Sequence, residues 1–331
     1  MQNKRWVLAS RPSGWLTEEN FRLETPPVGA PREGEVLVKN LWLSLDPYMR
    51  GRMNAAKSYV KPVEIGELMV GQTAGEVLES KHPAFAKGDS VLTGLGWQLF
   101  GCAKGDALNK VDAKRAPLSY YLGCLGMPGM TAYFGLKEIG QPKSGDTVVV
   151  SAASGAVGSV VGQLAKLWGC RAVGIAGGSA KCDYVTRELG FDACVDYKAG
   201  NLLRDLEAAC PKGVDVYFEN VGGAVLDTVL RVMNVSSRIV LCGMVADYNA
   251  TEPYGVKTLR SVLSNRIRMQ GMIVFDWKDR YVEAIKALAG YLAQGKLKYR
   301  ESVIEGLENA PRGLIGLLKG ENFGKQLVKL A

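Results

Sequence analysis

Short apolar runs separated by turn-forming residues make up the first hundred positions of the chain. Val36, Val38 and Leu41 mark one expected strand, and 69–77 and 89–92 have the same character. Prolines and glycines within 26–34 supply turns between such runs. The pattern predicts an antiparallel, barrel-like region of short strands with few helices.

From about Gly123 the pattern changes to an alternation of strands and helices. Thr147–Ser151 is a continuous apolar β-run, as expected for a strand that is covered on both faces. An amphipathic helix is expected over 159–168, with apolar residues at helical spacing on one face. This alternation predicts right-handed βαβ units and a parallel sheet. Further strands are expected at 172–175, 193–195, 214–218 and 238–242, and further helices at 182–189, 202–210 and 224–233.

The length of 331 residues favours two domains over a single core. From about Lys296 the chain returns to shorter strands and one helix, so we expect this segment to rejoin the first domain. The predicted division is a β-rich domain of residues 1–122 and 296–331 and an α/β domain of residues 123–295.

A glycine-containing turn joins the strand Thr147–Ser151 to the helix that follows it. Its sequence Ala153-x-Gly155-x-x-Gly158 has the Rossmann spacing, with alanine in the first glycine position. Gly155 allows the backbone to approach a pyrophosphate, and Gly158 allows close packing of the helix on the strand. Because the helix N-terminus presents free N–H groups to an anion, the turn predicts a dinucleotide site.

The end of the second expected strand indicates which dinucleotide binds. An NAD site usually has an acidic residue there, which contacts the ribose hydroxyls. This chain has Gly177, Gly178, Ser179 and Lys181 instead, which leave room and positive charge for a ribose phosphate. We therefore predict NADPH. The alternative for Lys181 is a surface residue in the first turn of a helix.

Composition and charge exclude several other classes of function. The net charge of +8 comes from scattered residues, which fit either a solvated face or an anionic ligand but give no cluster for nucleic acid. The chain has one histidine, His82, and seven cysteines without C-x-x-C spacing, so we expect no metal site and no disulfide framework. No stretch has the length of a membrane span, and residues 1–6 lack the features of a signal peptide. The expected compartment is the cytoplasm.

Four longer motifs carry a resemblance to a known family. Residues 43–53, 125–133, 219–223 and 320–325 resemble the prostaglandin reductase/2-alkenal reductase branch of the medium-chain dehydrogenases. Within that branch the chain is most similar to bacterial NADPH-dependent curcumin reductases. The resemblance implies a GroES-like catalytic domain and a Rossmann domain with a doubly wound parallel sheet. It also implies a cofactor between the two domains.

The resemblance also implies which residues contact the cofactor, at the positions that match the family's motifs. The implied NADPH contacts are Gly155, Ala156, Val157, Gly158, Lys181, Tyr197, Asn220, Cys242, Met244, Tyr248, Ile273, Val274, Phe275 and Asn322.

The resemblance further implies a homodimer joined through the Rossmann domains. Residues 268–274 are predicted to form an edge strand of the sheet, which a second copy of the chain would cover.

The zinc ligands of related dehydrogenases are missing from the corresponding motifs. Where zinc-dependent relatives have Gly-His-Glu, this chain has 71–73 as Gly-Gln-Thr. The expected reaction is therefore hydride addition to a polarised carbon–carbon double bond rather than alcohol oxidation at zinc. Tyr59 is our first candidate to stabilise the resulting enolate, Tyr48 the second and Tyr248 the third. Plant relatives use a tyrosine at the position that here is Ser264, so that role is not carried over.

The predicted activity is NADPH-dependent reduction of α,β-unsaturated ketones and aldehydes. The nearest alternative is an NADPH:quinone reductase. A second alternative is a cofactor-binding protein with little turnover. Packing in an aromatic wall is the alternative for each of the candidate tyrosines.

Overall fold

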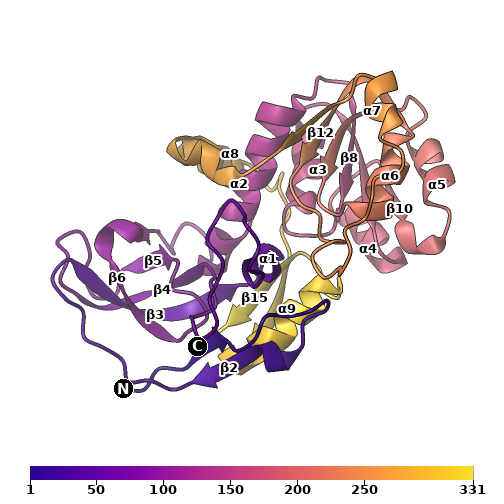
Figure 1. Ribbon diagram of the computed structural model, residues 1–331. Coiled ribbons are helices and arrows are strands. Elements are labelled where there is room, and N and C mark those ends of the chain that lie inside the picture. The colour runs from indigo at the N-terminus through magenta and orange to yellow at the C-terminus, as the bar shows by residue number, and fades with distance from the viewer. Residues whose placement is uncertain (331) are drawn as a thin grey trace. The chain divides into compact units, whose positions relative to one another are not determined.

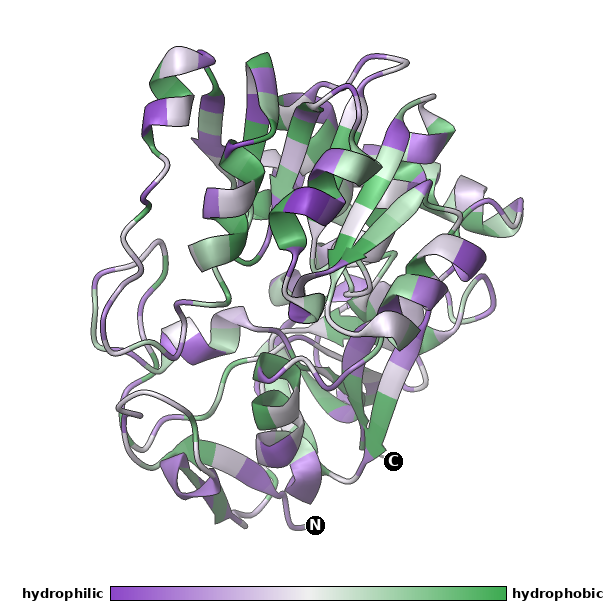
Figure 2. Cartoon of the chain, turned by 90° about the vertical axis from the view of Figure 1, so that its right-hand side faces the viewer, coloured by the Kyte–Doolittle hydropathy of each residue, from purple (hydrophilic) through white to green (hydrophobic). Residues whose placement is uncertain are grey.

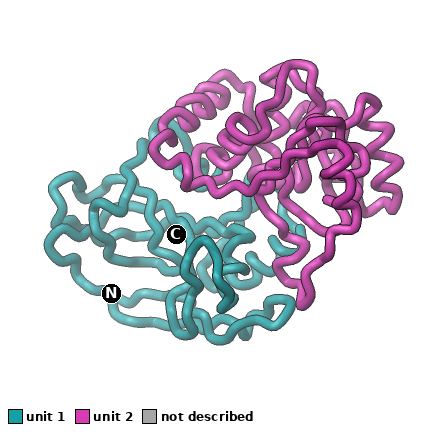
Figure 3. The backbone as a smooth tube through the Cα atoms, turned by 45° about the horizontal axis from the view of Figure 1, so that its top comes forward, with its two compact units in different colours: residues 1–123, 301–331 teal, residues 124–300 magenta. Residues whose placement is uncertain are grey.

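The computed structural model describes residues 1–330 of the chain (Figure 1). The chain forms two compact units, one from Met1–Gly123 together with the chain from Glu301 onward, and the other from Cys124–Arg300 (Figure 3).

The first unit is built on a seven-stranded sheet and a separate two-stranded sheet. In the larger sheet the order is β14-β15-β3-β4-β5-β7, and β6 also pairs with β3. All its pairs are antiparallel except β14 with β15. Because β15 pairs with β3, the C-terminal residues complete the sheet that the first hundred residues begin. The strands are β1 Arg5–Leu8, β2 Phe21–Glu24, β3 Glu35–Ser44, β4 Thr73–Ser80, β5 Ser90–Thr93, β6 Phe100–Lys104, β7 Asn109–Lys110, β14 Glu301–Glu305 and β15 Lys325–Lys329.

One expected strand of this unit is displaced along the chain. The strand predicted over 69–77 begins only at Thr73, as β4. Met69 instead donates its N–H to the Trp6 carbonyl and accepts from the Trp97 N–H, so it lies in an irregular crossing of three segments. Periodicity along one segment contains no information about such a crossing.

The second unit has a parallel sheet of six strands in the order β10-β9-β8-β11-β12-β13. Helices cover both faces of this sheet (Figure 1), which is the doubly wound arrangement that the strand–helix alternation predicted. All five residues of β8 are buried, as its continuous apolar run requires. Figure 2 shows hydrophobic residues along the strands and hydrophilic residues on the outer helices. The strands are β8 Thr147–Ser151, β9 Arg171–Ala176, β10 Ala193–Asp196, β11 Val214–Glu219, β12 Met233–Leu241 and β13 Arg268–Gly271.

The α-helices of the chain are short, and two predicted helices differ from the observed ones. The helix expected over 182–189 is α4 followed by the π-helical turn η5. The helix expected over 224–233 ends at Leu230, because Met233 already pairs with Val214 as the first residue of β12. The helices are α1 Tyr48–Arg52, α2 Met127–Phe134, α3 Gly158–Leu167, α4 Ser179–Asp183, η5 Tyr184–Glu188, α5 Leu202–Ala209, α6 Gly223–Leu230, α7 Arg260–Ser264, α8 Tyr281–Ala293 and α9 Ala310–Leu318.

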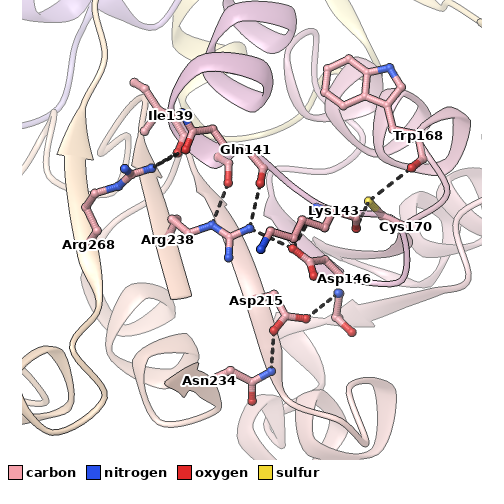
Figure 4. Close-up of polar contacts among 12 residues, drawn as sticks. Ile139, Gln141, Lys143, Asp146, Trp168, Cys170, Asp215, Asn234, Arg238 and Arg268 are labelled. Atoms are coloured by element: carbon pink, nitrogen blue, oxygen red, sulfur yellow. Dashed lines mark hydrogen bonds and ion pairs between the residues drawn. The ribbon is translucent and has the colours of Figure 1, made fainter. Parts of the chain in front are cut away.

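Two arginines fasten the amino-terminal side of the parallel sheet (Figure 4). The Arg238 guanidinium donates to the carbonyls of Gly140 and Gln141 at 2.9 and 3.0 Å, and pairs with Asp146 at 2.8 Å. Arg268 donates to the Ile139 carbonyl at 2.7 Å. These contacts satisfy the carbonyl groups where the π-helical turn η4 Gly135–Gly140 ends. The carboxyl ends of the strands lie at the opposite edge of the sheet, where ligands of doubly wound folds bind.

Candidate cofactor-binding and active site

The turn after β8 leaves no room for a side chain at its second glycine. A Cβ atom on Gly158 would lie 2.4 Å from the carbonyl oxygen of Ala152, which is backbone and cannot move aside. Ala152 itself has a φ of 52°, in the left-handed region, so the chain turns sharply immediately after the strand. Gly158 therefore allows α3 to begin against the end of β8.

Backbone N–H groups gather at the start of α3. Gly155, Ala156 and Val157 are partly exposed, while Gly158 is buried as the first residue of the helix. The first N–H groups of an α-helix have no partner within the helix, and they carry its positive dipole end. Gly155, Ala156 and Val157 thus form an accessible turn at the positive end of the α3 dipole, while Gly158 is buried and the Gly155 N–H donates to the Ala152 carbonyl at 2.9 Å.

Two lysines and a tyrosine surround the end of β9. A Cβ atom on Gly177 would lie 2.9 Å from the Tyr197 ring and 3.0 Å from the Lys198 side chain, so both residues lie against the turn. Burial lowers the pKa of Lys181, and the charge of nearby Lys198 lowers it further. Two cations that repel each other at one edge of the sheet favour an anion between them. The structure brings the predicted residues Lys181 and Tyr197 into this cluster.

Lys198 and Asp196 are members of this region that sequence reasoning missed. The Asp196 carboxylate accepts the N–H of Gly178 at 2.8 Å and the N–H of Lys198 at 2.9 Å. It thereby joins the turn after β9 to the turn after β10. Lys198 directly follows Tyr197, and this adjacency to a predicted phosphate contact is the signal that could have found it in the sequence.

Asn220 is held at the end of β11 by hydrogen bonds to β8. Its backbone N–H donates to the Ser151 hydroxyl and its side-chain amide donates to the Ser151 carbonyl, both at 2.8 Å. The Ser151 hydroxyl donates in turn to the Glu219 carboxylate at 2.7 Å, and the Val221 N–H donates to the same oxygen. Glu219 is completely buried. Ser151 and Glu219 are functional candidates that sequence reasoning missed.

The residues predicted after β12 lie beside this network. The N–H of Cys242 donates to the Glu219 carbonyl at 2.9 Å. Burial, with a contribution from Glu219, raises the pKa of the Cys242 thiol to about 12. A Cβ atom on Gly222 would lie 3.2 Å from Met244, and one on Gly243 would lie 3.4 Å from the Tyr248 hydroxyl. Cys242, Met244 and Tyr248 therefore border the carboxyl ends of β11 and β12.

The segment 273–275 follows β13, at the edge of the same sheet. Val274 is buried and its carbonyl accepts the Tyr281 hydroxyl at 3.2 Å, while Ile273 accepts the Asp276 N–H. Phe275 is half exposed. The predicted contact of this segment with a nicotinamide carboxamide stays a prediction, and so does that of Asn322. Asn322 lies in the first unit and donates to the Gly324 carbonyl at 2.8 Å.

The two candidate tyrosines of the first unit lie within electrostatic reach of each other. Tyr48 begins α1, and burial raises its pKa, with further contributions from Asp46 and Tyr59. Tyr59 is 56% exposed. A phenol with a raised pKa keeps its proton at neutral pH and can act as a hydrogen-bond donor.

A buried ion pair fixes the segment that carries Tyr48. The Lys325 ammonium, 1% exposed, contacts the Asp46 carboxylate at 2.9 Å and the Leu45 carbonyl at 2.7 Å. The Ser44 hydroxyl donates to the same carboxylate. Separating Lys325 from Asp46 would leave a buried charge without a partner, which is costly. The pair therefore keeps the turn at 45–46, next to Tyr48, attached to β15.

A pocket of about 470 Å³ opens beside the loop that follows the Cys242–Tyr248 region. Asp227 of α6 anchors this loop, because its carboxylate accepts the Tyr254 hydroxyl, the N–H groups of Lys257 and Thr258, and the Thr258 hydroxyl. The pocket is lined by Gly223, Ala224, Ala246, Asp247, Ala250, Glu252, Pro253, Tyr254, Gly255 and Lys257.

Within residues 1–330 no three histidine, cysteine, aspartate or glutamate side chains gather as a group that could hold a metal ion. Over the same residues no helix combines the length and apolar character that crossing a membrane requires. The Ser264 hydroxyl donates to the Arg260 carbonyl within α7.

Comparison with known proteins agrees with this arrangement. Residues 4–111 match the family described as the N-terminal domain of oxidoreductase, and residues 156–290 match the zinc-binding dehydrogenase family. The chain is 52% identical to an NADPH-dependent curcumin reductase of Escherichia coli, across 100% of this chain and 97% of the relative. It is 43% identical to an NADP⁺-dependent 2-alkenal reductase of Nicotiana tabacum, across 100% and 98%.

A solved structure shares the whole fold. The crystal structure of CurA from Vibrio vulnificus in complex with NADPH superposes with a TM-score of 0.95, at 49% identity over 99% of both chains. The predicted resemblance and the two-part fold are thereby confirmed. The chain belongs to the medium-chain dehydrogenase/reductase family, in the branch that contains the curcumin reductases and the 2-alkenal reductases.

Proposed function

We propose that this protein is an NADPH-dependent reductase of the carbon–carbon double bond in α,β-unsaturated ketones and aldehydes. The observation that carries the proposal is the pair Lys181 and Lys198 at the end of β9, the strand that pairs with β8, after which the pyrophosphate turn begins. The chain matches, along its whole length, relatives that are named for the reduction of curcumin and 2-alkenals.

The residues at the carboxyl ends of the parallel strands fit NADPH. Gly155, Ala156 and Val157 are accessible, and the space beside Gly158 excludes even one Cβ atom, so α3 begins directly against the end of β8, as the Rossmann turn requires. Lys181 and Lys198 provide two positive charges for a ribose phosphate, and Tyr197 lies against the same turn. NADPH, when bound, supplies the hydride.

Tyr59 and Tyr48 are the proposed catalytic residues for the substrate. As the β-carbon of an enone gains a hydride, negative charge develops on the carbonyl oxygen, and a tyrosine hydroxyl that donates to this oxygen stabilises the enolate. Tyr48 is protonated at neutral pH, as an ordinary tyrosine is, and burial raises its pKa further. A proton must then reach the α-carbon, from a tyrosine or from water.

The test is NADPH consumption with a panel of short enals, long-chain enones, diaryl enones and quinones. We expect turnover with the enals and enones and a saturated carbonyl product. Preference for quinones would support the quinone reductase alternative instead. Stable NADPH binding with no turnover on any member of the panel would support a cofactor-binding protein.

We further propose a homodimer in the cytoplasm. β13 is an edge strand of the six-stranded sheet, and most of its residues are exposed, so a second copy can cover it. The seven cysteines are all free, as is usual in a reducing compartment. Light scattering at micromolar concentration tests the dimer, and a monomer there contradicts it.

A further inference from the structure

Two cysteines of the second unit meet at the edge of the proposed phosphate site. Cys182 lies in α4 and Cys194 lies in β10, and the Cys194 thiol donates to the Cys182 sulfur across 3.2 Å. This is closer than the roughly 3.5–4.0 Å at which nonbonded carbon atoms pack. By comparison, Cys102 and Cys170 donate to backbone carbonyls, of Gly29 and Lys143.

Cys182 and Cys194 are both partly exposed residues. Cys102 and Cys242 are also partly exposed, whereas Cys124, Cys170 and Cys210 are buried. Because Cys182 and Cys194 lie next to each other, the second thiol can complete a disulfide after the first is oxidised.

The pair joins the two segments that carry the phosphate-binding lysines. Cys182 directly follows Lys181 in α4. Cys194 lies two residues before Asp196, whose carboxylate holds the N–H groups of Gly178 and Lys198. A covalent bond between the two cysteines would therefore connect α4, which carries Lys181, to β10, which leads to Lys198.

We propose that Cys182 and Cys194 form a reversible disulfide that weakens the binding of NADPH. The effect on NADPH rests on the proposed function, while the disulfide itself does not. Formation of the bond requires the sulfur atoms to approach from 3.2 Å to about 2.05 Å, which draws α4 and Lys181 toward β10. α4 has only five residues and continues into the π-helical turn η5, so it is the element that moves.

The oxidant of the two thiols is hydrogen peroxide or an organic hydroperoxide. The Cys182 thiolate attacks one peroxide oxygen, the O–O bond breaks, and an alcohol or water leaves as Cys182 becomes a sulfenic acid. The Cys194 sulfur then attacks the Cys182 sulfur, the new S–S bond forms, and water leaves. The two thiols lose two electrons and the peroxide gains them.

The roles of the two thiols follow from their hydrogen bond. Burial raises the pKa of both, but the hydrogen bond lowers the pKa of Cys182 and raises that of Cys194 further. Cys182 is therefore the attacking thiol. Since only the thiolate reacts, the rate of oxidation rises with pH.

The experiment treats the reduced full-length protein with tert-butyl hydroperoxide and follows two independent readouts. Peptide mass spectrometry reports the Cys182–Cys194 link, and steady-state kinetics report the KM for NADPH. We expect the linked peptide together with a rise in KM of at least about threefold, while kcat changes little and dithiothreitol reverses both effects. C182S and C194S should abolish the link and the change in KM, and C102S should leave both unchanged.

Two outcomes overturn the proposal. The first is oxidation of Cys102 with no linked Cys182–Cys194 peptide. The second is a fully linked protein with an unchanged KM for NADPH. If C194S does not fold, C182S alone decides the matter. Reduced protein that fails to bind NADPH refutes the proposed function, yet the mass measurement still tests the disulfide.

Discussion

The Ser151 hydroxyl, at the last position of β8, donates a 2.7 Å hydrogen bond to the Glu219 carboxylate at the last position of β11. Both residues are completely buried. The same hydroxyl accepts the backbone N–H of Asn220. The second Glu219 oxygen, Oε2, has no hydrogen-bond partner within residues 1–330. Burial of a carboxyl group is costly unless it is hydrogen-bonded, and the two hydrogen bonds that Glu219 accepts connect the end of β11 to β8 and to the turn that follows.

Glu219 is therefore expected to act as a positioning residue for Asn220. Glu219→Gln retains an acceptor for Ser151 and Val221, and it should change the KM for NADPH by less than about threefold. Glu219→Leu removes the acceptor, and it should raise KM by about tenfold or more, with a smaller effect on kcat.

Asp215 provides the matched control at the other end of β11. Its carboxylate accepts the Thr147 N–H and the Asn234 amide, both at 2.8 Å. Asp215→Ala should lower the melting temperature and leave the KM for NADPH unchanged. If Glu219→Leu behaves like Asp215→Ala, its role is structural only.

Lys181 is expected to determine the preference for NADPH over NADH. A charge-assisted contact is worth roughly 1.5–3 kcal/mol, so Lys181→Ala should weaken NADPH binding by about ten- to a hundredfold. NADH binding should barely change, because NADH lacks the phosphate. Fluorescence titration with both cofactors measures this, and the exposed Lys212→Ala is the control for loss of a positive charge. Equal wild-type efficiency with the two cofactors would refute the assignment.

The sequence predicted the parts of the fold that depend on local pattern. The apolar run Thr147–Ser151 indicated a covered strand, and the glycine spacing after it indicated a turn against a helix. Both follow from neighbouring residues. The irregular crossing at Met69 and the early end of α6 were not predictable in this way, because each is set by pairing with a distant segment.

The same distinction holds for the candidate site. Lys181 was predicted from its position after the second expected strand, where an NAD site usually has an acidic residue, and Tyr197 was carried over from the family resemblance. Ser151 and Glu219 were missed, because they are 68 positions apart and each looks ordinary within its own strand. Only the pairing of β8 with β11 brings them together.

Asp227 is expected to stabilise the loop beside the pocket in a pH-dependent way. Burial alone would raise its pKa, but hydrogen bonds from Thr258, Tyr254 and the Lys257 N–H lower it below the usual value. A carboxylate with a depressed pKa stabilises the fold above its unfolded pKa of about 3.9, and this contribution disappears as pH falls through the folded pKa.

Asp227→Asn should consequently remove about 1–3 kcal/mol of stability at pH 7 and less at pH 3. Urea unfolding at the two pH values measures the difference, and limited proteolysis should show earlier cleavage within 246–258. Asp247→Asn, which lines the same pocket, is the matched control. A loss of stability that is equal at both pH values contradicts the assigned role of the carboxylate.

The reaction itself is expected to leave the carbonyl group intact. Direct reduction of a carbonyl concentrates the developing charge on one alkoxide oxygen, and the chain's one histidine, His82, has its ring in a turn where Nδ1 accepts the Ala84 N–H. A conjugated double bond instead spreads the developing charge into an enolate, which one or two hydrogen bonds stabilise. Product analysis after turnover of an enone should give the saturated ketone. An allylic alcohol as the main product contradicts the proposal.

Tyr59 is the first residue expected to donate to that enolate, and Tyr48 is the second. Tyr59→Phe removes the donor and keeps the ring, and loss of such a donor lowers turnover by about 10²–10³. NADPH affinity should change little, because the predicted NADPH contacts do not include Tyr59 and its proposed hydrogen bond is to the substrate oxygen. Tyr121→Phe serves as the control, since Tyr121 donates to the Asp112 carbonyl in the same unit. If Tyr59→Phe turns over normally and Tyr48→Phe does not, the donor is Tyr48, the less exposed of the two tyrosines. If both variants retain full turnover, the enolate is stabilised by neither, and the catalytic assignment fails while the assignment of the cofactor site remains.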